Sequence, residues 1–265
     1  MNRKEMSTKY GTVCYWVSSE WNSSDKTLVF LHGLTANHTM FDNQLTYFSE
    51  KYNLLTWDAP AHGESRPYSG FSYQNTAEAL KQILDENHID TAVLIGQSMG
   101  GYIAQSFIQR YPERVFAFIA IDTSPYGEIY YSKSDKWWLR QIEWMSKLFP
   151  HDTLKKSIAK QVSVTEVGYQ NMMSMLVSYD KKELCYLMGI GYAAFLEDNK
   201  DMQITCPVLI LLGDCDKTGK VQQYCRAWSE KERYKLIIIN GAAHNSNVDN
   251  PDEVNAAIEH FLHTM

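Results

Sequence analysis

The amino-acid sequence predicts a doubly wound, mostly parallel α/β sheet with a helical segment inserted late in that sheet. Short apolar runs alternate with segments of helical periodicity along most of the 265 residues. Several of these runs are continuously apolar, which is typical of parallel strands that helices cover on both faces. A chain of this length can bury one large core, so we expect one sheet with one inserted module.

Seven apolar runs have the length and the β-branched content of buried strands. In chain order they are Val13 to Val17, Leu28 to Leu31, Leu54 to Trp57, Ala92 to Ile95, Val115 to Ile121, Val208 to Leu212 and Leu236 to Ile239. Functional sites in such sheets form beyond the carboxyl ends of the strands. Residues that directly follow these runs are therefore the first candidates for a site.

Four segments between the strands have the spacing of amphipathic helices. They are Tyr73 to Glu86, Met99 to Gln109, Val221 to Ser229 and Asp252 to Leu262. Tyr111-Pro112 ends the second of them, because proline cannot continue a helix.

The alternation stops between Pro125 and Asp201, in a stretch rich in aromatic residues and methionine. Its spacing is mostly helical, so we interpret residues 125–200 as a helical cap, and residues 1–124 and 201–265 as the core that carries the sheet. Most of its large side chains should pack internally. A minority should shape an apolar substrate pocket, with Trp137, Trp138 and Met172 as candidates, since aromatic residues and methionine line adaptable cavities.

Composition argues against several classes of partner. The net charge of −6 disfavours nucleic acid or an anionic membrane, because both call for a basic face. No apolar run approaches the ~18 residues of a membrane-spanning helix, and Met1 to Tyr10 lacks the apolar core of a signal peptide. The five cysteines have no CxxC spacing, which indicates free thiols. We expect a cytoplasmic protein with no metal site and no stable membrane association; the oligomeric state stays open.

Ser98 lies where an apolar strand gives way to a helix, in Ile95-Gly96-Gln97-Ser98-Met99-Gly100-Gly101. Glycines flank the serine at the positions where side chains would collide in so tight a turn. The turn leaves the serine exposed at a helix N-terminus, whose free N–H groups favour developing negative charge. This strand–turn–helix context around G-x-S-x-G indicates a nucleophile elbow.

A serine hydroxyl needs an adjacent base and a third group that orients the base. His244 is the best candidate base, because it follows the run Leu236 to Ile239 on a loop. Asp214 and Asp216 follow another strand. We favour Asp216 as the orienting acid, since Asp214 directly follows a glycine and suits a role in the turn. Asp122, at the end of a third strand, is the third candidate acid.

Acyl transfer also needs N–H donors for the oxyanion. The N–H of Met99, which follows the serine, is one candidate. The N–H of Leu34 is the second, because a glycine before it permits a sharp exit from the strand. Nearby His32, Asp58 and His62 are interpreted as structural residues of their loops.

With the chain order Ser98, Asp216, His244, the sequence resembles the serine hydrolases of the α/β-hydrolase superfamily, in the branch with a helical cap. The resemblance rests on His32-Gly33, Asp58 with His62-Gly63-Glu64-Ser65, Gly96 to Gly101, Gly213 to Asp216 and Gly241 to His244, and spans nearly the whole chain outside the insertion. In relatives the acid commonly lies three residues after a glycine, which supports Asp216. Serine at the elbow, where epoxide hydrolases and haloalkane dehalogenases carry aspartate, argues against both activities.

The sequence therefore predicts a serine hydrolase that cleaves a small or medium, largely apolar carboxylic ester, thioester or lactone through an acyl-enzyme. Its partner is a small-molecule substrate, and no metal or organic cofactor is implied. A C–C bond hydrolase or menaquinone-pathway lyase with the same triad is a second hypothesis. In the lyase, Arg140, Lys147, Lys155 or Lys156 would face carboxylate groups. A cofactor-free perhydrolase is the third hypothesis, and a slow-turnover ligand-binding signalling protein is the fourth.

Overall fold

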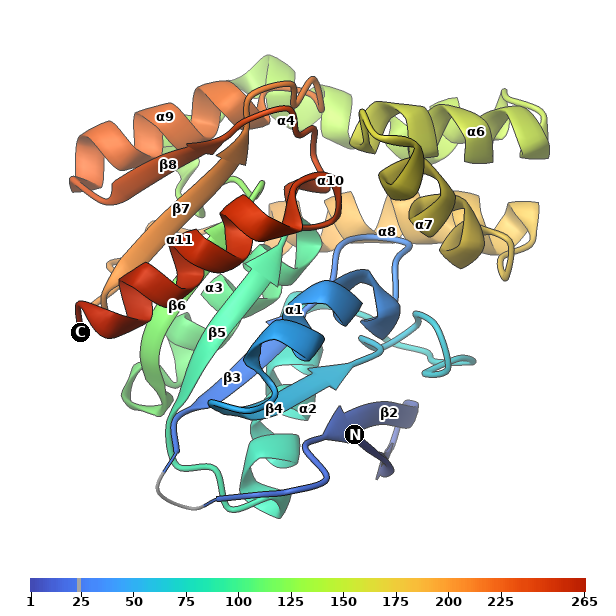
Figure 1. Ribbon diagram of the computed structural model, residues 1–265. Coiled ribbons are helices and arrows are strands. Elements are labelled where there is room, and N and C mark those ends of the chain that lie inside the picture. The colour runs from blue at the N-terminus through green and yellow to red at the C-terminus, as the bar shows by residue number, and fades with distance from the viewer. Residues whose placement is uncertain (23–24) are drawn as a thin grey trace.

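The computed structural model describes residues 1–22 and 25–265. Over these residues the chain forms an eight-stranded sheet in the order β1-β2-β4-β3-β5-β6-β7-β8 (Figure 1). The strands are β1 (Asn2–Thr8), β2 (Gly11–Val17), β3 (Thr27–Leu31), β4 (Asn53–Trp57), β5 (Ala92–Gln97), β6 (Val115–Ile121), β7 (Val208–Gly213) and β8 (Lys235–Ile239). β1 and β2 run antiparallel to their neighbours, and all other pairs are parallel. The predicted doubly wound α/β sheet is confirmed.

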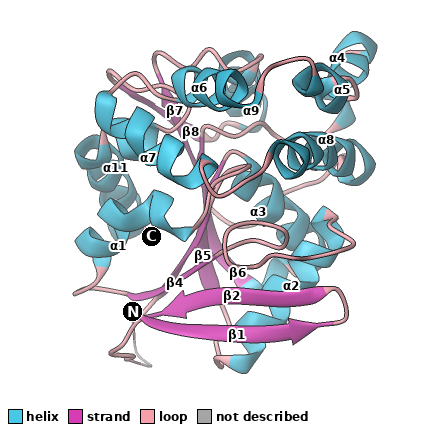
Figure 2. Cartoon of the chain, turned by 90° about the vertical axis from the view of Figure 1, so that its right-hand side faces the viewer, coloured by secondary structure: helices cyan, strands magenta, loops and turns pink. Residues whose placement is uncertain are grey.

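All seven predicted apolar runs lie within β2 to β8, and the run from Val115 to Ile121 matches its strand at both ends. Every residue of β3, β4, β5 and β7 is buried, which explains their continuous apolar character. β1 was not predicted, because its residues are mostly polar and only Met6 is buried. It pairs with β2 at the edge of the sheet, at the bottom of Figure 2.

Helices cover both faces of the sheet. α1 (Asp42–Phe48) and α11 (Pro251–His263) lie in front of it in Figure 1, and α2 (Tyr73–Glu86) and α3 (Met99–Arg110) lie behind it. α9 (Val221–Glu232) packs against β7 and β8. The four predicted helices correspond to α2, α3, α9 and α11. The remaining helical elements outside residues 133–198 are short: α10 (Ser246–Asp249) and the 3-10 turns His38–Phe41, Pro112–Arg114 and Glu128–Tyr130, the last of which lies just before that segment.

Five helices lie between β6 and β7 in the chain, where mostly helical structure was expected. They are α4 (Lys133–Leu139), α5 (Ile142–Lys147), α6 (His151–Val162), α7 (Glu166–Leu176) and α8 (Lys181–Asp198). They gather at the carboxyl ends of the parallel strands, in the upper half of Figure 2. Side-chain caps begin α4, α7 and α8, with Ser132, Thr165 and Asp180 each accepting a bond from a backbone N–H of the first turn.

The longest of these helices, α8, is fastened to the core at two places. Arg110 of α3 donates to Asp198 at the end of α8 over 2.6 Å, and the Tyr73 hydroxyl of α2 donates to the Gly191 carbonyl over 3.2 Å. These two hydrogen bonds hold α8 in a fixed position relative to α2 and α3. Within the described chain, no helix is both long and apolar enough to cross a bilayer.

Candidate active site

Ser98 occupies a strained turn between β5 and α3. Its φ of 50° and ψ of −114° place a non-glycine residue in the left-handed region, which costs about 1–3 kcal/mol. The turn needs glycine on both sides. A Cβ at Gly100 would overlap the carbonyl oxygen of Leu31, and a Cβ at Gly96 would lie 2.5 Å from the carbonyl oxygen of Gly100. The close approach of neighbouring backbone, not chain flexibility, therefore requires both glycines.

The structure brings Ser98, His244 and Asp216 together from the ends of three parallel strands. Ser98 Oγ lies 2.8 Å from His244 Nε2, and His244 Nδ1 lies 2.8 Å from Asp216 Oδ2. Both His244 and Asp216 are buried. The second oxygen of Asp216 accepts a bond from the Thr218 N–H over 2.7 Å, which holds the carboxylate in place.

The two candidate acids on the β7 loop have different surroundings. Asp214 is exposed and accepts a bond from the Ala242 N–H over 3.1 Å. This bond ties the Asp214 turn to the loop before His244. Asp216, by contrast, points inward to the imidazole. Of the two aspartates, only Asp216 contacts the imidazole, whereas Asp214 bonds the backbone of the neighbouring loop.

The charges of the pair stabilise each other. Burial disfavours the imidazolium, but the Asp216 carboxylate, its hydrogen bond and the charge of Asp122 outweigh burial and raise the pKa of His244 above its usual value. Burial likewise disfavours the Asp216 carboxylate, but His244 and the bond from Thr218 lower the pKa of Asp216. His244 is thus a stronger base than a free imidazole.

Asp122 lies behind this pair as a fully buried carboxylate at the end of β6, with a left-handed φ of 46°. It accepts bonds from the Gly213 N–H over 2.8 Å and from the Ser246 N–H over 3.0 Å. It therefore ties the β7 exit to the loop that follows His244. Burial and the nearby Asp216 charge raise the pKa of Asp122 to about 7. In the described chain no hydrogen bond joins it to the imidazole of His244.

The two expected N–H donors lie beside the serine. Leu34 and Met99 both line the cavity that contains Ser98. Met99 begins α3, so its N–H has no partner within the helix. Among the hydrogen bonds of the described residues, none uses the backbone N–H of Leu34 or of Met99. Both N–H groups are free to donate to a ligand oxygen.

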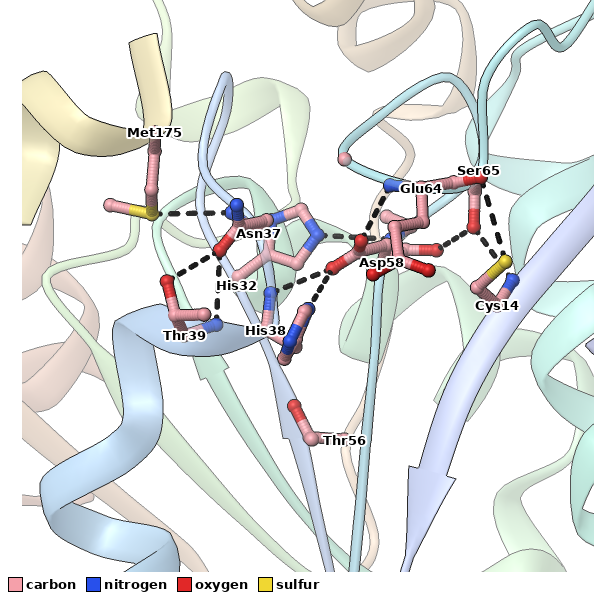
Figure 3. Close-up of polar contacts among 12 residues, drawn as sticks. Cys14, His32, Asn37, His38, Thr39, Thr56, Asp58, Glu64, Ser65 and Met175 are labelled. Atoms are coloured by element: carbon pink, nitrogen blue, oxygen red, sulfur yellow. Dashed lines mark hydrogen bonds and ion pairs between the residues drawn. The ribbon is translucent and has the colours of Figure 1, made fainter. Parts of the chain in front are cut away.

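A buried network fixes the loop that carries Leu34 (Figure 3). His32 contacts the Gly33 carbonyl through Nδ1 over 2.8 Å and accepts from the Ala59 N–H through Nε2 over 2.9 Å. Burial lowers the pKa of His32, so its imidazole is neutral. This geometry agrees with the structural role expected for His32.

Asp58 forms the centre of the same network. It accepts bonds from the backbone N–H of His38 over 2.8 Å, from its ring Nδ1 over 2.7 Å, and from the Glu64 N–H over 2.6 Å. The His38 ring in turn stacks on Trp16, with centroids 3.6 Å apart. These contacts join the loop after β3 to the loop after β4. Asp58 therefore helps to set the position of the Leu34 loop.

Two cavities meet at Ser98 and His244. The larger has a volume of about 530 Å³ and the smaller of about 300 Å³. The residues that line both are Leu34, Ser98, Gln161, Tyr192, Thr218 and His244. Apolar side chains from the helices between β6 and β7 form much of both walls: Trp138, Leu139 and Ile142 in the larger, and Leu154, Ile158, Met172 and Met188 in the smaller.

Two of the three side chains expected to contact substrate have such a position. Trp138 lines the larger cavity, and Met172 lines the smaller one. Trp137 lines neither of them. Its ring lies edge-on to the Trp138 ring, with centroids 4.8 Å apart, and both rings are about half exposed. Adjacent residues of α4 point in different directions, so only one of the two lines the cavity. The placement of Trp137 thus differs from the expectation.

Tyrosines are the lining residues that the sequence did not indicate. Those that line the larger cavity are Tyr73, Tyr102, Tyr131, Tyr192 and Tyr224. They come from α2, α3, α8, α9 and the segment before α4, so only the packing of these helices brings them together. The signal in the sequence was no more than the abundance of aromatic residues.

Positive charge is sparse around the cavities. Of the lysine and arginine residues in the described chain, Lys217 and Lys220 line them, and Lys220 pairs with Asp135 over 2.7 Å. The cations proposed for a lyase, Arg140, Lys147, Lys155 and Lys156, line neither cavity. Within the described residues, no cluster of three or more histidine, cysteine, aspartate or glutamate side chains is arranged to hold a metal ion.

Comparisons with known proteins agree with this architecture. Residues 26–155 match the family model described as the alpha/beta hydrolase fold. A Haemophilus influenzae protein provisionally named an esterase/lipase is 26% identical over 89% of this chain and 82% of its own length. A Bacillus subtilis protein provisionally named 2-succinyl-6-hydroxy-2,4-cyclohexadiene-1-carboxylate synthase is 25% identical over 94% of this chain and 95% of its own length.

The fold also matches solved structures. A thermophilic esterase from Thermogutta terrifontis superimposes with a TM-score of 0.80 at 18% identity, covering 100% of this chain and 99% of its own. The sheet order, the elbow after β5 and the match to the family model agree with one another. The chain therefore has the α/β-hydrolase fold, and its sequence is similar to members of that superfamily.

Proposed function

We propose that this protein is a serine hydrolase that cleaves a largely apolar carboxylic ester, thioester or lactone through an acyl-enzyme. The observation that carries the proposal is the continuous chain of contacts from Ser98 Oγ to His244 Nε2 and from His244 Nδ1 to Asp216, each 2.8 Å long. A nucleophile, a base and an orienting acid in this arrangement can activate a hydroxyl that is otherwise unreactive near neutral pH.

In the proposed reaction, Ser98 Oγ attacks the substrate carbonyl while His244 Nε2 takes the hydroxyl proton. The Asp216 carboxylate stabilises the imidazolium that forms. The N–H groups of Leu34 and Met99 bind the oxyanion, each contributing about 3 kcal/mol to transition-state stabilisation. His244 then gives its proton to the leaving alcohol. A water molecule, deprotonated by the same imidazole, releases the acid and restores Ser98.

The two cavities suggest how the substrate is held. Because they meet at Ser98, one would take the acyl group and the other the alcohol group of an ester. Their walls favour apolar groups of small or medium size, given volumes of about 530 and 300 Å³. We propose that residues 125–200 act as the cap that closes both cavities, on a core of residues 1–124 and 201–265.

A lyase of the kind named for the Bacillus subtilis relative is the second candidate, because that relative matches over almost its whole length. A substrate with several carboxylates would need cations near the serine. Lys217 is the one lining cation without a carboxylate partner in the described chain. Ester hydrolysis therefore has the better support.

Hydrolysis of nitrophenyl esters with acyl chains of two to ten carbons tests the proposal. Ser98→Ala should lose at least about a thousandfold in kcat, since the nucleophile is removed. Ser157→Ala is the matched control, because Ser157 lines the smaller cavity but does not contact His244. Fluorophosphonate labelling should be abolished in Ser98→Ala alone.

Equal ester hydrolysis by the wild type and Ser98→Ala would end the proposal. Absence of ester turnover, together with Ser98-dependent conversion of the menaquinone precursor, would replace it with the second candidate.

A further inference from the structure

Five tyrosines form much of the wall of the larger cavity, but their hydroxyl groups differ in the protein groups that they contact. Two of these hydroxyls donate a hydrogen bond within the protein, Tyr73 to the Gly191 carbonyl and Tyr131 to the Pro125 carbonyl. The hydroxyl of Tyr102 lies near the Ser124 side chain, and that of Tyr224 lies near the Asp135 carboxylate. Among the described residues, none bonds the hydroxyl of Tyr192. The other four hydroxyls each have a polar group of the protein beside them, whereas the Tyr192 hydroxyl has no such neighbour among the described residues.

Tyr192 lies where the two cavities meet. It lines both of them, as do Ser98 and His244. The residue before it, Gly191, packs against the Leu34 side chain: a Cβ at Gly191 would lie 2.8 Å from Leu34 Cδ1. The turn of α8 that carries Tyr192 therefore rests directly on the Leu34 loop.

The chemistry of the Tyr192 hydroxyl favours donation. Burial raises its pKa, so it stays protonated at neutral pH. A partly buried hydroxyl without a protein partner can bond only solvent or a ligand. An apolar substrate group that displaces the solvent leaves the hydroxyl unsatisfied, which is unfavourable, whereas an acceptor oxygen replaces the lost bond.

We infer that Tyr192 is a specificity-determining residue, whose hydroxyl donates a hydrogen bond to a second acceptor oxygen of the substrate close to the reacting carbonyl. The inference rests on the proposed function and narrows its substrate class. The preferred substrates are esters or lactones that carry an ether, hydroxyl or keto oxygen one or two atoms from that carbonyl. Sites built to bond a polar group discriminate against analogues that lack it.

A pair of isosteric esters tests this assignment. Nitrophenyl methoxyacetate has an ether oxygen where nitrophenyl butyrate has a methylene group, and the two are otherwise alike in size. The quantity measured is the ratio of kcat/KM for methoxyacetate to that for butyrate, which cancels any general effect of a variant. In Tyr192→Phe this ratio should fall about fivefold to tenfold relative to the wild type.

Tyr131→Phe is the matched control, since Tyr131 lines the same cavity but its hydroxyl donates to the Pro125 carbonyl over 2.7 Å. It should leave the ratio unchanged and lower the thermal unfolding midpoint, because a protein hydrogen bond is lost. Tyr192→Phe should leave the midpoint unchanged, since its hydroxyl bonds no described residue.

Three results would overturn the inference. An unchanged ratio in Tyr192→Phe, with turnover that still requires Ser98, overturns it and leaves the proposed function intact. A lowered unfolding midpoint in Tyr192→Phe means that the hydroxyl has a structural partner, contrary to the assignment. Absence of Ser98-dependent turnover of both esters in the wild type removes the proposed function, and the inference with it.

Discussion

Replacing Asp216 with asparagine should lower kcat/KM for an ester about a thousandfold while the protein stays folded. Asparagine keeps the shape of the side chain but removes the charge that lies 2.8 Å from His244 Nδ1. The imidazole becomes a cation when it takes the Ser98 proton. At about 4 Å between the charge centres and an effective dielectric constant of about 20, the pair interacts by about 4 kcal/mol. Each ~1.4 kcal/mol is a factor of ten in rate, so the expected loss is about a thousandfold.

Asp214→Asn is the control for this experiment, because it lies two residues away on the same loop and bonds the Ala242 N–H, not the imidazole. It should change kcat/KM by less than about threefold and lower the free energy of unfolding by about 1 kcal/mol. The assay is steady-state ester hydrolysis at pH 8, with circular dichroism of each variant.

Retention of more than a tenth of the wild-type rate by Asp216→Asn, or an equally large loss in Asp214→Asn, would contradict the role of Asp216 as the orienting acid. Activity that persists in Asp216→Asn but vanishes after a further Asp122→Asn change would identify Asp122 as the acid.

Three further predictions concern pH and stability. The pKa of His244 is raised, and only its neutral imidazole can take the proton of the Ser98 hydroxyl. We therefore expect kcat/KM to rise with pH through a midpoint above about 6.5. A lower midpoint in a pH–rate profile would contradict this. The Cβ of alanine in Gly100→Ala would overlap the carbonyl oxygen of Leu31, so this change should lower the free energy of unfolding in urea by about 3 kcal/mol. A decrease of less than about 1 kcal/mol would show that the turn can relax. The lowered pKa of Asp58, which bonds His38, means that its contribution is present above about pH 4 and is lost as pH falls. Asp58→Asn should therefore cost about 3 kcal/mol at pH 7 and progressively less as the pH falls below about 4, and a cost independent of pH would refute the charged network.

The sequence by itself determined the sheet and the tight turn that holds Ser98. Continuous apolar runs can be buried only as covered strands, which is why seven of the strands were predicted, and the glycines around Ser98 permit little other than the elbow. β1 was not predicted because an edge strand buries little apolar side-chain surface. Backbone pairing with β2, and not a pattern of apolar side chains, keeps it in the sheet.

Only the tertiary structure decided which polar groups meet. Asp214 and Asp216 are two residues apart and chemically identical, and the course of the β7 loop alone turns Asp216 to His244. The rotation of α4 excludes Trp137 from the cavities, and the packing of α8 on the Leu34 loop brings Tyr192 to their junction. The spacing of apolar residues within a short segment shows which residues of a helix or strand are buried. Contacts between loops, by contrast, depend on how distant elements are placed relative to one another, and no short segment contains that information.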